Sequence, residues 1–452
     1  MKLNTAFRVK RGDIVSFIGA GGKTATLHAL GHELVEQGWR VLATTSTRIP
    51  TEQLDFFPSA IQANRSLMEI NAALSGQGFV FLYDEIRELM ASGYPLEKIP
   101  ALLDSVASDV LLIEADDAAG RPLKAPLEHE PRIPPETTVV VAVASLTALG
   151  VPLSKEFVYN HEAIQSRYGF GEGAEILPVW LAQVLRDETL GLKGIPSQAR
   201  TVVYLNRMNR YRYLRARRIT HFLLRQKRID RVAFGSARSA DPVIECHQHT
   251  AAIVLAAGAS TRMGRAKLLL PWRDGRCVLE QVVHVLHQTR IPEIRVVLGP
   301  HAELLQDKLA AYEIRTVMNQ DYREGEMLSS LQLGLRSLPS HIQAALIVLG
   351  DQPRLQPSVV FKLLTNFMSN DKGIVAPVYH GTRGHPILIH RSHWSELLAL
   401  TEGSPRDVID QYPHDTSLVT VNSDTVLADV DTPRDYAQQR LLAGLPPMPI
   451  QD

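Results

Sequence analysis

Cysteine is almost absent from this chain, and so is net charge. Among 452 residues only Cys246 and Cys277 carry a thiol, which excludes a disulfide framework and a CxxC zinc site. Lysine plus arginine equals aspartate plus glutamate at 48 each, so no overall electrostatic field recruits nucleic acid or an anionic membrane surface. We therefore expect neither of these two partners.

Long apolar runs are missing as well. The most apolar stretch, Thr138 to Val151, covers about 14 residues, which is too short to span a bilayer and fits a buried strand. The first residues, MKLNTAFRVKRGD, lack the apolar core of a signal peptide. The sequence predicts a globular protein of the cytoplasm.

What the chain does contain is a regular alternation of apolar strand-like runs and helical segments. This alternation is typical of α/β domains, in which helices cover both faces of a mostly parallel sheet. A chain of 452 residues is too long for one ordinary core. Residues 236–250 are polar, non-periodic and broken by a proline. We therefore place the boundary there and expect one domain over residues 1–245 and another over 246–452.

The second domain opens with an apolar run and a loop rich in glycine and cations. Residues 251–267 read AAIVLAAGASTRMGRAK, which predicts a strand buried on both faces followed by a turn. Backbone N–H groups near Gly258, Ser260 and Gly264 can approach an anion, and Arg262 and Lys267 can balance its charge. The pattern favours a triphosphate site, although a strand followed by a basic surface turn also fits it.

Two acidic motifs later in the chain supply the carboxylates that a triphosphate site needs for Mg²⁺. Asp351 follows the apolar run ALIVLG, and Asp429 and Asp431 lie in LADVDTP, which we interpret as a second strand end before a helix. Mg²⁺ prefers a few carboxylates together with phosphate oxygens and water. Each motif also has a structural explanation, because Asp-Gln-Pro is a good turn and Asp431 is a good helix entry.

The first domain contains a second glycine-rich loop, GAGGKT, between a strand and a helix. The motif resembles a phosphate-binding P-loop, but Phe17 stands where the full pattern requires its first glycine. Backbone N–H groups of Gly21 and Gly22, together with Lys23, are candidates for binding a β- or γ-phosphate, and Thr24 for binding Mg²⁺. A tight strand-to-helix turn without a ligand is the alternative.

A further acidic strand end follows in the first domain. LLIEAD places Glu114 and Asp116 at the carboxyl end of an apolar strand, where open α/β sheets bind their ligands. We expect these two carboxylates to bind Mg²⁺, with ATP or GTP as the candidate nucleotide. The proline-broken loop downstream carries Arg121, Lys124 and Glu130, which suits a rigid segment that holds charges near this site.

Four motifs in order carry a family resemblance in the second domain. LAAGASTRMGRAKLLLPW, LGDQP, the GHP of residues 384–386 and DVDTP resemble the molybdenum cofactor cytidylyltransferase family, a branch of the MobA-like nucleotidyltransferases. The resemblance implies a Rossmann-like fold and transfer of CMP from CTP to the phosphate of molybdopterin, with release of pyrophosphate. The Ala256-Ala257-Gly258 form is similar to the cytidylyl branch.

The resemblance also implies roles for individual residues. Gly258, Arg262 and Lys267 are expected to hold the triphosphate, with Arg262, Lys267 and Asp351 as the catalytic side chains. Asp351 and Asp431 are expected to hold Mg²⁺. Two further expectations are a base-binding region around Ser330 and a pterin-facing His385. Nucleotide contacts are expected along the loop, at Ala256, Ala257, Gly258, Ser260 and Gly264.

The first domain resembles the YqeC family of selenium-dependent hydroxylase accessory proteins. GAGGKT, IEADDAAGRPLKAPLEHEP and LTALGVPL carry this resemblance, which implies a nucleotide-binding accessory role in hydroxylase cofactor maturation and an apo molybdenum hydroxylase as a partner. Residues 206–209 read Asn-Arg-Met-Asn where a base-reading Asn-Lys-x-Asp motif is expected, so recognition of a particular base here is in doubt.

Two other functions fit the same sequence. The site of the second domain also suits guanylyl transfer or nucleotidyl transfer to a sugar phosphate. From a different functional class, the chain suits a non-catalytic chaperone that carries the cofactor to a molybdenum hydroxylase, and the paired aspartates and Lys267 argue against that class.

Overall fold

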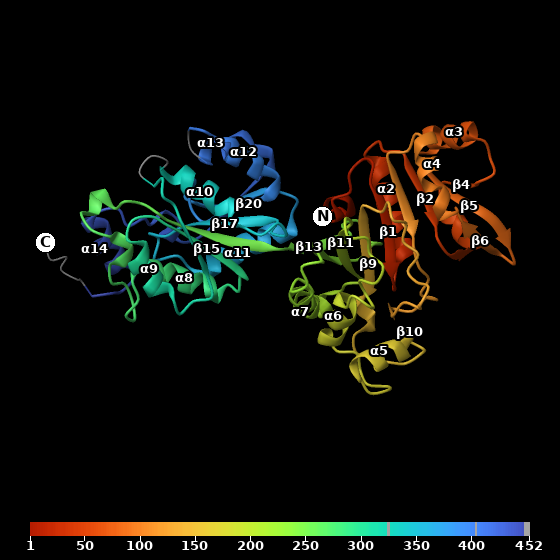
Figure 1. Ribbon diagram of the computed structural model, residues 1–452, viewed down its shortest axis with the longest axis horizontal. Coiled ribbons are helices and arrows are strands. Elements are labelled where there is room, and N and C mark those ends of the chain that lie inside the picture. Colours follow the sequence, from red (N-terminus) through yellow and green to blue (C-terminus); the bar gives the residue numbers. More distant parts are fainter. Residues whose placement is uncertain (323–325, 403–404, 447–452) are drawn as a thin grey trace. The chain divides into compact units, whose positions relative to one another are not determined.

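The computed structural model describes residues 1–322, 326–402 and 405–446. The chain divides into two compact units, Met1–His247 and Gln248–Asp452. Each unit is an α/β domain with its own largely parallel sheet (Figure 1), as the sequence predicts. Among the described residues, no helix is both long and apolar enough to cross a membrane.

The sheet of the first unit has β1 near its centre. Its strands in spatial order are β13 (Val243–Gln248), β12 (Arg231–Gly235), β11 (Arg200–Asn206), β9 (Val139–Ser145), β1 (Ile14–Gly19), β7 (Val110–Glu114), β2 (Val41–Thr45), β5 (Phe79–Arg87), β6 (Met90–Gly93) and β3 (Arg48–Pro50), with β4 (Ser59–Gln62) paired to β5. The pairs from β12 through β5 are parallel. Two short strands, β8 (Leu123–Lys124) and β10 (Val158–Tyr159), form a separate pair.

Helices pack on both faces of this sheet. They are α1 (Leu3–Phe7), α2 (Lys23–Glu36), α3 (Leu67–Gln77), α4 (Ile99–Ser105), α5 (His161–Tyr168), α6 (Pro178–Arg186) and α7 (Tyr213–Leu223). Two clusters of buried apolar side chains fill the two faces, because strands buried on both sides expose alternate side chains to each layer of helices. The central strands β1, β2, β7 and β9 therefore consist almost wholly of buried residues.

The segment in which we place the domain boundary contains a strand. Residues 243–248 make the edge strand β13 beside β12. The buried side chain of Cys246 lies in the core of the first unit. A strand of mixed polar and apolar residues at a sheet edge gives little periodic signal, which explains why the sequence does not reveal it. The expected boundary between residues 245 and 246 falls inside this strand, and as a functional boundary it stays a prediction.

The second unit has an open sheet with β14 and β17 at its centre. Its strands in spatial order are β16 (Arg315–Met318), β15 (Glu293–Leu298), β14 (Thr250–Ala256), β17 (Ala344–Leu349), β20 (Ile387–His390), β18 (Ile374–Tyr379) and β19 (Thr382–Arg383), with β21 (Thr416–Thr420) paired to β18. Pairing is parallel from β16 through β17, whereas β20 runs antiparallel to both of its neighbours.

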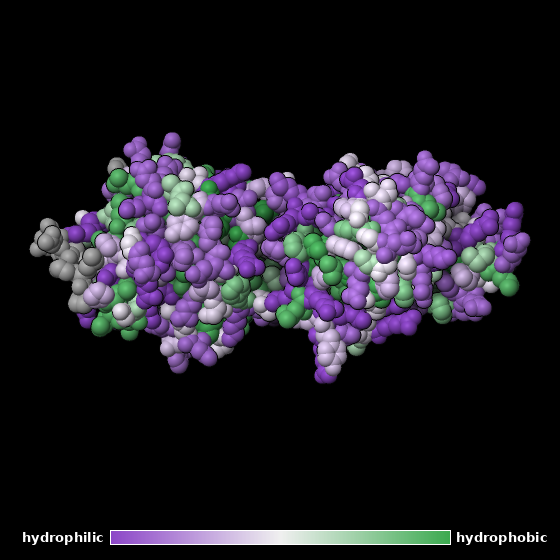
Figure 2. All heavy atoms as spheres, turned by 90° about the horizontal axis from the view of Figure 1, so that it is seen from below, coloured by the Kyte–Doolittle hydropathy of each residue, from purple (hydrophilic) through white to green (hydrophobic). Residues whose placement is uncertain are grey.

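Seven described helices accompany this sheet: α8 (Val278–Gln288), α9 (Ala302–Leu309), α10 (Glu326–Arg336), α11 (Pro357–Ser369), α12 (Trp394–Ala399), α13 (Pro405–Gln411) and α14 (Pro433–Leu442). Two buried apolar clusters again occupy the two faces of the sheet. On the face drawn in Figure 2, hydrophilic residues cover most of the surface and hydrophobic ones occur in separate patches. Most apolar residues of each sheet are thus buried in the core of the same unit.

Candidate functional site

In the second unit, one lysine joins the two predicted acidic motifs. The ammonium of Lys267 donates hydrogen bonds to Asp351 Oδ2 at 2.5 Å and to Asp431 Oδ1 at 2.9 Å. Arg262 pairs with the other oxygen of Asp431 at 3.0 Å. The cation-bearing loop and both acidic motifs, separated by 84 and 164 residues from Lys267, therefore meet at one place.

The elements around β17 explain this convergence. Asp351 lies at the carboxyl end of β17, beside β14, whose own carboxyl end leads into the loop with Lys267. We expected Asp431 to follow a strand, and this expectation is wrong. Asp431 follows a 3-10 turn over residues 424–427. A backbone hydrogen bond from Val430 N–H to Asp351 O, at 3.0 Å, holds its segment against the end of β17. The sequence thus identifies the acidic residues, but it does not reveal that Asp431 lies on an irregular segment.

Asp429 is the third carboxylate of the two acidic motifs. Its carboxylate accepts a hydrogen bond from Gln352 at 2.6 Å, and Gln352 is itself buried. Burial and the charge of Asp351 raise the pKa of Asp429 above its ordinary value. The three carboxylates thus share one neighbourhood, in which Asp351 and Asp431 are partly buried and Asp429 is exposed.

The loop between β14 and Lys267 is open at its glycine. Ala256 and Ala257 are buried at the end of the strand, and a Cβ built on Gly258 would meet no atom within 4 Å. Ser260 and Gly264 both have left-handed backbones, with φ of 55° and 73°, and the Ser260 hydroxyl accepts a hydrogen bond from the Lys267 N–H at 3.3 Å. Since packing does not demand a glycine at position 258, the free space beside it is available to a ligand.

Ser330 and His385 lie on separate elements of this unit. Ser330 is buried on α10, where its hydroxyl accepts a hydrogen bond from Asn319 at 2.9 Å. His385 lies two residues before β20, whose Ile387 pairs with Ile347 of β17. His385 is therefore at the same sheet edge as Asp351. The expected contacts of Ser330 with a base and of His385 with a pterin stay predictions.

Electrostatics at this site favour charged partners. Burial lowers the pKa of Lys267, but the charges of Asp351 and Asp431 and the hydrogen bonds to them outweigh this effect and raise it. Burial would raise the pKa of Asp431, yet Lys267 and Arg262 hold it below its ordinary value. For His385, burial lowers the pKa to about 4, with help from Arg383 and Arg406. This imidazole is neutral near pH 7.

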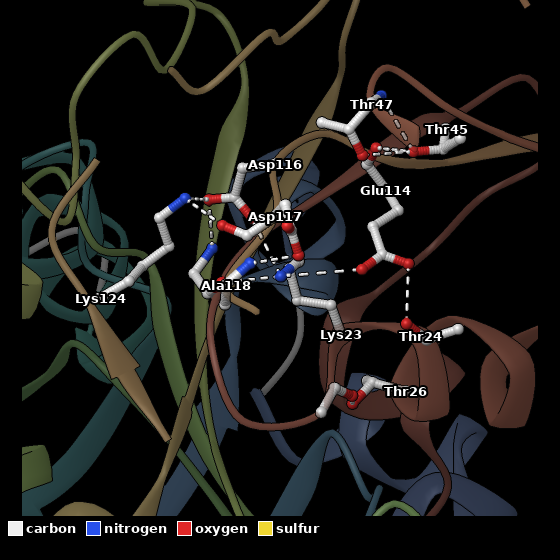
Figure 3. Close-up of polar contacts among 12 residues, drawn as sticks. Lys23, Thr24, Thr26, Thr45, Thr47, Glu114, Asp116, Asp117, Ala118 and Lys124 are labelled. Atoms are coloured by element: carbon white, nitrogen blue, oxygen red, sulfur yellow. Dashed lines mark hydrogen bonds and ion pairs between the residues drawn. The ribbon is translucent and has the colours of Figure 1, made fainter. Parts of the chain in front are cut away.

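The first unit contains a similar but more deeply buried arrangement. We call each of the two arrangements, a lysine held between two carboxylates, a clamp. The ammonium of Lys23 lies 3.1 Å from Asp116 Oδ1 and 3.7 Å from Glu114 Oε1 (Figure 3). It also donates a hydrogen bond to the Gly19 carbonyl at 2.9 Å. Thr24 donates its hydroxyl proton to Glu114 Oε2 at 2.9 Å. The predicted P-loop residues and the predicted acidic residues are therefore brought together by β1, α2 and β7.

The backbone of this loop is tightly packed. Gly21 has φ of +78°, and a Cβ there would come within 2.3 Å of the Ser145 Cβ. Asn206 holds the loop from the side, since its amide donates to the Gly21 carbonyl at 3.1 Å and accepts from Ala237 N–H at 3.1 Å. A Cβ on Gly22 would meet that same amide at 2.2 Å. Asn206 thus supports the loop, which agrees with the doubt about base reading by residues 206–209.

A cavity of about 860 Å³ lies over this loop. Gly21, Gly22, Lys23, Thr24 and Glu114 all line it, but Asp116 does not. Asp116 is 2% exposed and turns inward, because it accepts a hydrogen bond from Gly19 N–H at 2.8 Å and pairs with Lys124 at 3.3 Å. Strand β7 ends at Glu114, so the alternation that would aim both carboxylates the same way does not continue.

Lys124 was expected near Glu114 and Asp116, but the sequence suggested no role for it. Its side chain is 2% exposed, and its ammonium contacts Glu130 at 2.8 Å as well as Asp116. A fully buried lysine needs carboxylate partners, and its position among prolines eight residues after Asp116 was the only signal. Lys23, Asp116, Lys124 and Glu130 form a buried chain of alternating charges, with Glu114 at its pocket end.

Neither carboxylate pair alone makes a complete metal site. Among the described residues, no group of three or more histidine, cysteine, aspartate or glutamate side chains is arranged to hold a metal ion. The donor types nevertheless suit Mg²⁺, which takes oxygen ligands and commonly keeps water and substrate phosphates in its shell. Two carboxylates converging on one cation at Lys267, and Glu114 with the Thr24 hydroxyl in the first unit, fit that pattern.

Two family models match the chain. The model of the MobA-like NTP transferase domain matches residues 252–417, and the model of the YqeC protein matches residues 15–162. The first match contains the glycine-rich loop from Gly258 to Lys267, Asp351 and His385, and the second contains Lys23, Glu114 and Asp116. Each match thus covers one of the two clamps, and only Asp431 lies beyond them.

Three curated relatives are similar to one unit or the other. The uncharacterized protein YqeC of Escherichia coli strain K12 is 33% identical over 202 residues, which are 44% of this chain and 78% of that protein. The molybdenum cofactor cytidylyltransferase of the same strain is 26% identical over 186 residues, 41% of this chain and 92% of that enzyme. Nicotine blue oxidoreductase of Paenarthrobacter nicotinovorans is 30% identical over 193 residues, 40% of this chain and 91% of the relative.

Proposed function

The chain belongs to the YqeC family through its first unit and carries a MobA-like NTP transferase domain in its second, and we propose that this nucleotidyltransferase moves CMP from CTP to molybdopterin. Pyrophosphate is the second product. The first unit acts as an accessory domain in the maturation of a molybdenum hydroxylase, whose apo form is the expected partner.

One observation carries the proposal for the second unit. Lys267, Asp351 and Asp431 converge from three distant segments on one edge of the sheet, beside a loop with free space at Gly258. Such a site offers a cation for phosphate oxygens and two carboxylates for a divalent metal. The similarity to a molybdenum cofactor cytidylyltransferase over 92% of that enzyme supports the choice of base and acceptor.

The reaction needs positioning and charge stabilisation rather than a protein nucleophile. A phosphate oxygen of the acceptor attacks the α-phosphorus in line, and the bond from that phosphorus to the pyrophosphate oxygen breaks. Lys267 and Arg262 stand where they can stabilise the charge that develops on the leaving pyrophosphate. Backbone N–H groups from Ala257 to Gly264 orient the triphosphate against them.

Asp351 and Asp431 are the residues that would hold Mg²⁺. When bound, this ion neutralises phosphate oxygens and fixes their geometry. Asp429 accepts a hydrogen bond from Gln352, the residue that follows Asp351 in the chain. Ser330 and Asn319 belong to the proposed base side, and the neutral His385 lies at the sheet edge where the acceptor approaches.

The test is a transfer assay with each nucleotide. The full-length protein is incubated with Mg²⁺, molybdopterin and CTP, GTP, ATP or UTP, and pyrophosphate and the nucleotidylated pterin are measured. We expect product with CTP. Product only with GTP would overturn the cytidylyl assignment, and product only when a sugar phosphate replaces molybdopterin would overturn the acceptor. Binding of molybdopterin without turnover by any nucleotide would show a carrier instead of an enzyme.

The accessory role has a separate test. We expect the full-length chain to bind an apo molybdenum hydroxylase and to release it after the cofactor is inserted. Co-purification of the two proteins, compared with the same hydroxylase already loaded with cofactor, measures this preference. Equal retention of the apo and loaded forms would contradict the proposed role in maturation.

A further inference from the structure

The cavity of the first unit is lined by more positive than negative side chains. Five cationic side chains line it, but only two carboxylates do, Glu114 and Asp117. Four of the cations are arginines, and in the part of the chain that the structure describes none of the four pairs with a carboxylate. They are Arg48, Arg121, Arg207 and Arg238. Such a surplus of positive charge around a concave surface attracts a polyanion.

The floor of the cavity presents the groups that bind phosphate and cation. It consists of the tight loop at Gly21 and Gly22 and the first turn of the 14-residue helix α2. Lys23 and Thr24 line the cavity from that turn, and Glu114 faces the Thr24 hydroxyl from β7 (Figure 3). Apolar side chains of Ala25, Ile49 and Phe56 line another part of the wall, which suits the flat ring of a base.

The buried charges around Lys23 determine whether its ammonium can move toward a ligand. The ammonium pairs with Glu114 and Asp116, and moving a buried ammonium away from a buried carboxylate leaves an uncompensated charge. Asp116 does not depend on Lys23 alone, because its Oδ2 also pairs with Lys124 at 3.3 Å and accepts from Gly19 N–H at 2.8 Å. Lys124 is fixed in turn by Glu130 at 2.8 Å.

Among the described residues, Glu114 pairs with no second cation. It contacts Lys23 through one carboxylate oxygen and the Thr24 hydroxyl through the other. If Lys23 moves, a divalent cation between Glu114 and Thr24 is the group that restores charge balance there. Carboxylate and hydroxyl oxygens are suitable ligands for Mg²⁺.

We propose that this cavity is a second nucleoside triphosphate site, in which Lys23 exchanges its two carboxylate partners for phosphate oxygens while Mg²⁺ takes its place beside Glu114 and Thr24. Lys124 is the positioning residue that makes the exchange possible, since it keeps Asp116 neutralised. Asp116 is then an internal anchor and not a metal ligand. This inference does not depend on the reaction proposed for the second unit.

Hydrogen–deuterium exchange on the full-length protein tests the site separately from the second unit. Samples contain Mg²⁺ with ATP, GTP, CTP or inorganic triphosphate, and peptides covering residues 19–26 and 112–121 are followed. We expect at least one nucleotide to slow exchange in these peptides. Protection by inorganic triphosphate alone would reduce the site to a polyphosphate site and overturn the assignment to nucleotides. Protection confined to residues 255–270 would overturn the site altogether.

Glu114→Gln tests the cation. This isosteric change removes the charge, and we expect the Mg²⁺-dependent part of the affinity to fall by at least ~10-fold. Glu97→Gln, at an exposed position of the same unit, is the matched control and should behave as the parent protein. An unchanged Mg²⁺ dependence in Glu114→Gln would overturn the role of Glu114.

Lys124→Met tests the exchange. Without Lys124, Lys23 must stay with Asp116, so nucleotide affinity should drop, whereas Lys124→Arg should restore most of it. If Lys23 kept its carboxylates during binding, Lys124→Met would leave affinity unchanged, and that result would overturn the exchange. Hydrogen–deuterium exchange rates of β1 and β9, measured without nucleotide, show whether Lys124→Met is folded. If it is not folded, Glu114→Gln decides the proposal.

Discussion

Two lysines, one in each unit, are each held by two carboxylates, yet their surroundings differ. Lys23 is 5% exposed, with a second buried lysine next to it, inside a loop where added Cβ atoms would collide with neighbouring residues. Lys267 follows a loop with free space at Gly258, and its second cationic neighbour, Arg262, has a side chain that is 71% exposed.

The difference bears on the two phosphate sites that we propose. In the first unit, packing constrains the loop, and buried charges compensate one another. In the second unit, the loop has free space at Gly258 and its charges are more exposed. We therefore expect the first loop to be the more rigid of the two.

The largest expected contrast concerns stability. Lys23→Met leaves Glu114 and Asp116 without their shared cation in a buried place, so we expect the first unit to lose about 3–5 kcal/mol of unfolding free energy. Lys267→Met removes a more solvated contact and should cost the second unit only about 1 kcal/mol. Denaturant unfolding followed by hydrogen exchange in β1 and β14 measures each unit. Equal losses would contradict the difference in burial on which the comparison is based.

Activity should show the reverse contrast. Asp351→Asn removes one of the two carboxylates of the proposed metal site, and we expect CMP transfer to fall at least ~100-fold with little change in folding. Asp371→Asn, at an exposed position of the same unit, is the control. The readout is pyrophosphate release at saturating CTP. Near-normal transfer by Asp351→Asn would remove this residue from the reaction.

The two loops can be compared by the same substitution in each. Gly21→Ala forces a left-handed backbone onto alanine and a collision with Ser145, so we expect it to cost the first unit about 2 kcal/mol. Gly258→Ala meets no protein atom and should change stability by less than about 0.5 kcal/mol. It should instead raise the KM for CTP, because the methyl group occupies space next to the triphosphate. A stable Gly21→Ala would show that the first loop is less constrained than its packing indicates.

The smallest expected effect is a pH dependence confined to the second unit. The pKa of His385 is about 4 in the folded chain, below its ordinary value near 6.5. A histidine whose pKa is lowered by folding contributes stability to the folded state above pH 6.5, and this contribution is lost as the pH falls toward 4. For a half-buried ring we expect a loss of about 1 kcal/mol between pH 7 and pH 5, after allowance for solvent screening.

His385→Gln isolates this contribution. Unfolding of the second unit is measured at pH 7 and pH 5 in the parent and the variant. The variant should lose less stability over this interval, while the first unit should show the same pH dependence in both proteins. Identical curves for the second unit would place the His385 ring in contact with water in the folded state.

The fold and much of the site could be predicted from local sequence. Uninterrupted apolar runs predicted the central strands β1, β7, β14 and β17, because strands buried on both faces need such runs. The strand-to-loop transitions at Gly21 and Gly258 located the two glycine-rich loops. Asp351 was correctly placed at a strand end, since a charged residue directly after a buried run marks the edge of the sheet.

Three features of the structure could not be read from the sequence, because each depends on contacts between distant segments. Asp431 reaches Lys267 from an irregular segment and not from a strand. Asp116 turns inward to Lys124 although Glu114, two residues earlier, faces the cavity. Polar residues 243–248 form an edge strand because a neighbouring strand is present to pair with them. Local periodicity carries no information about any of these partners.

The sequence by itself determined the two α/β units, the positions of their glycine-rich loops and the acidic residues available to each. Only the tertiary structure decided which carboxylate each lysine contacts, which of them faces a cavity and that Lys124 stands behind Asp116. The physical reason is range: backbone preferences and hydrophobic periodicity act over a few residues, whereas a buried charge is stabilised by whichever opposite charge folding brings within about 4 Å, however far away in the chain it lies.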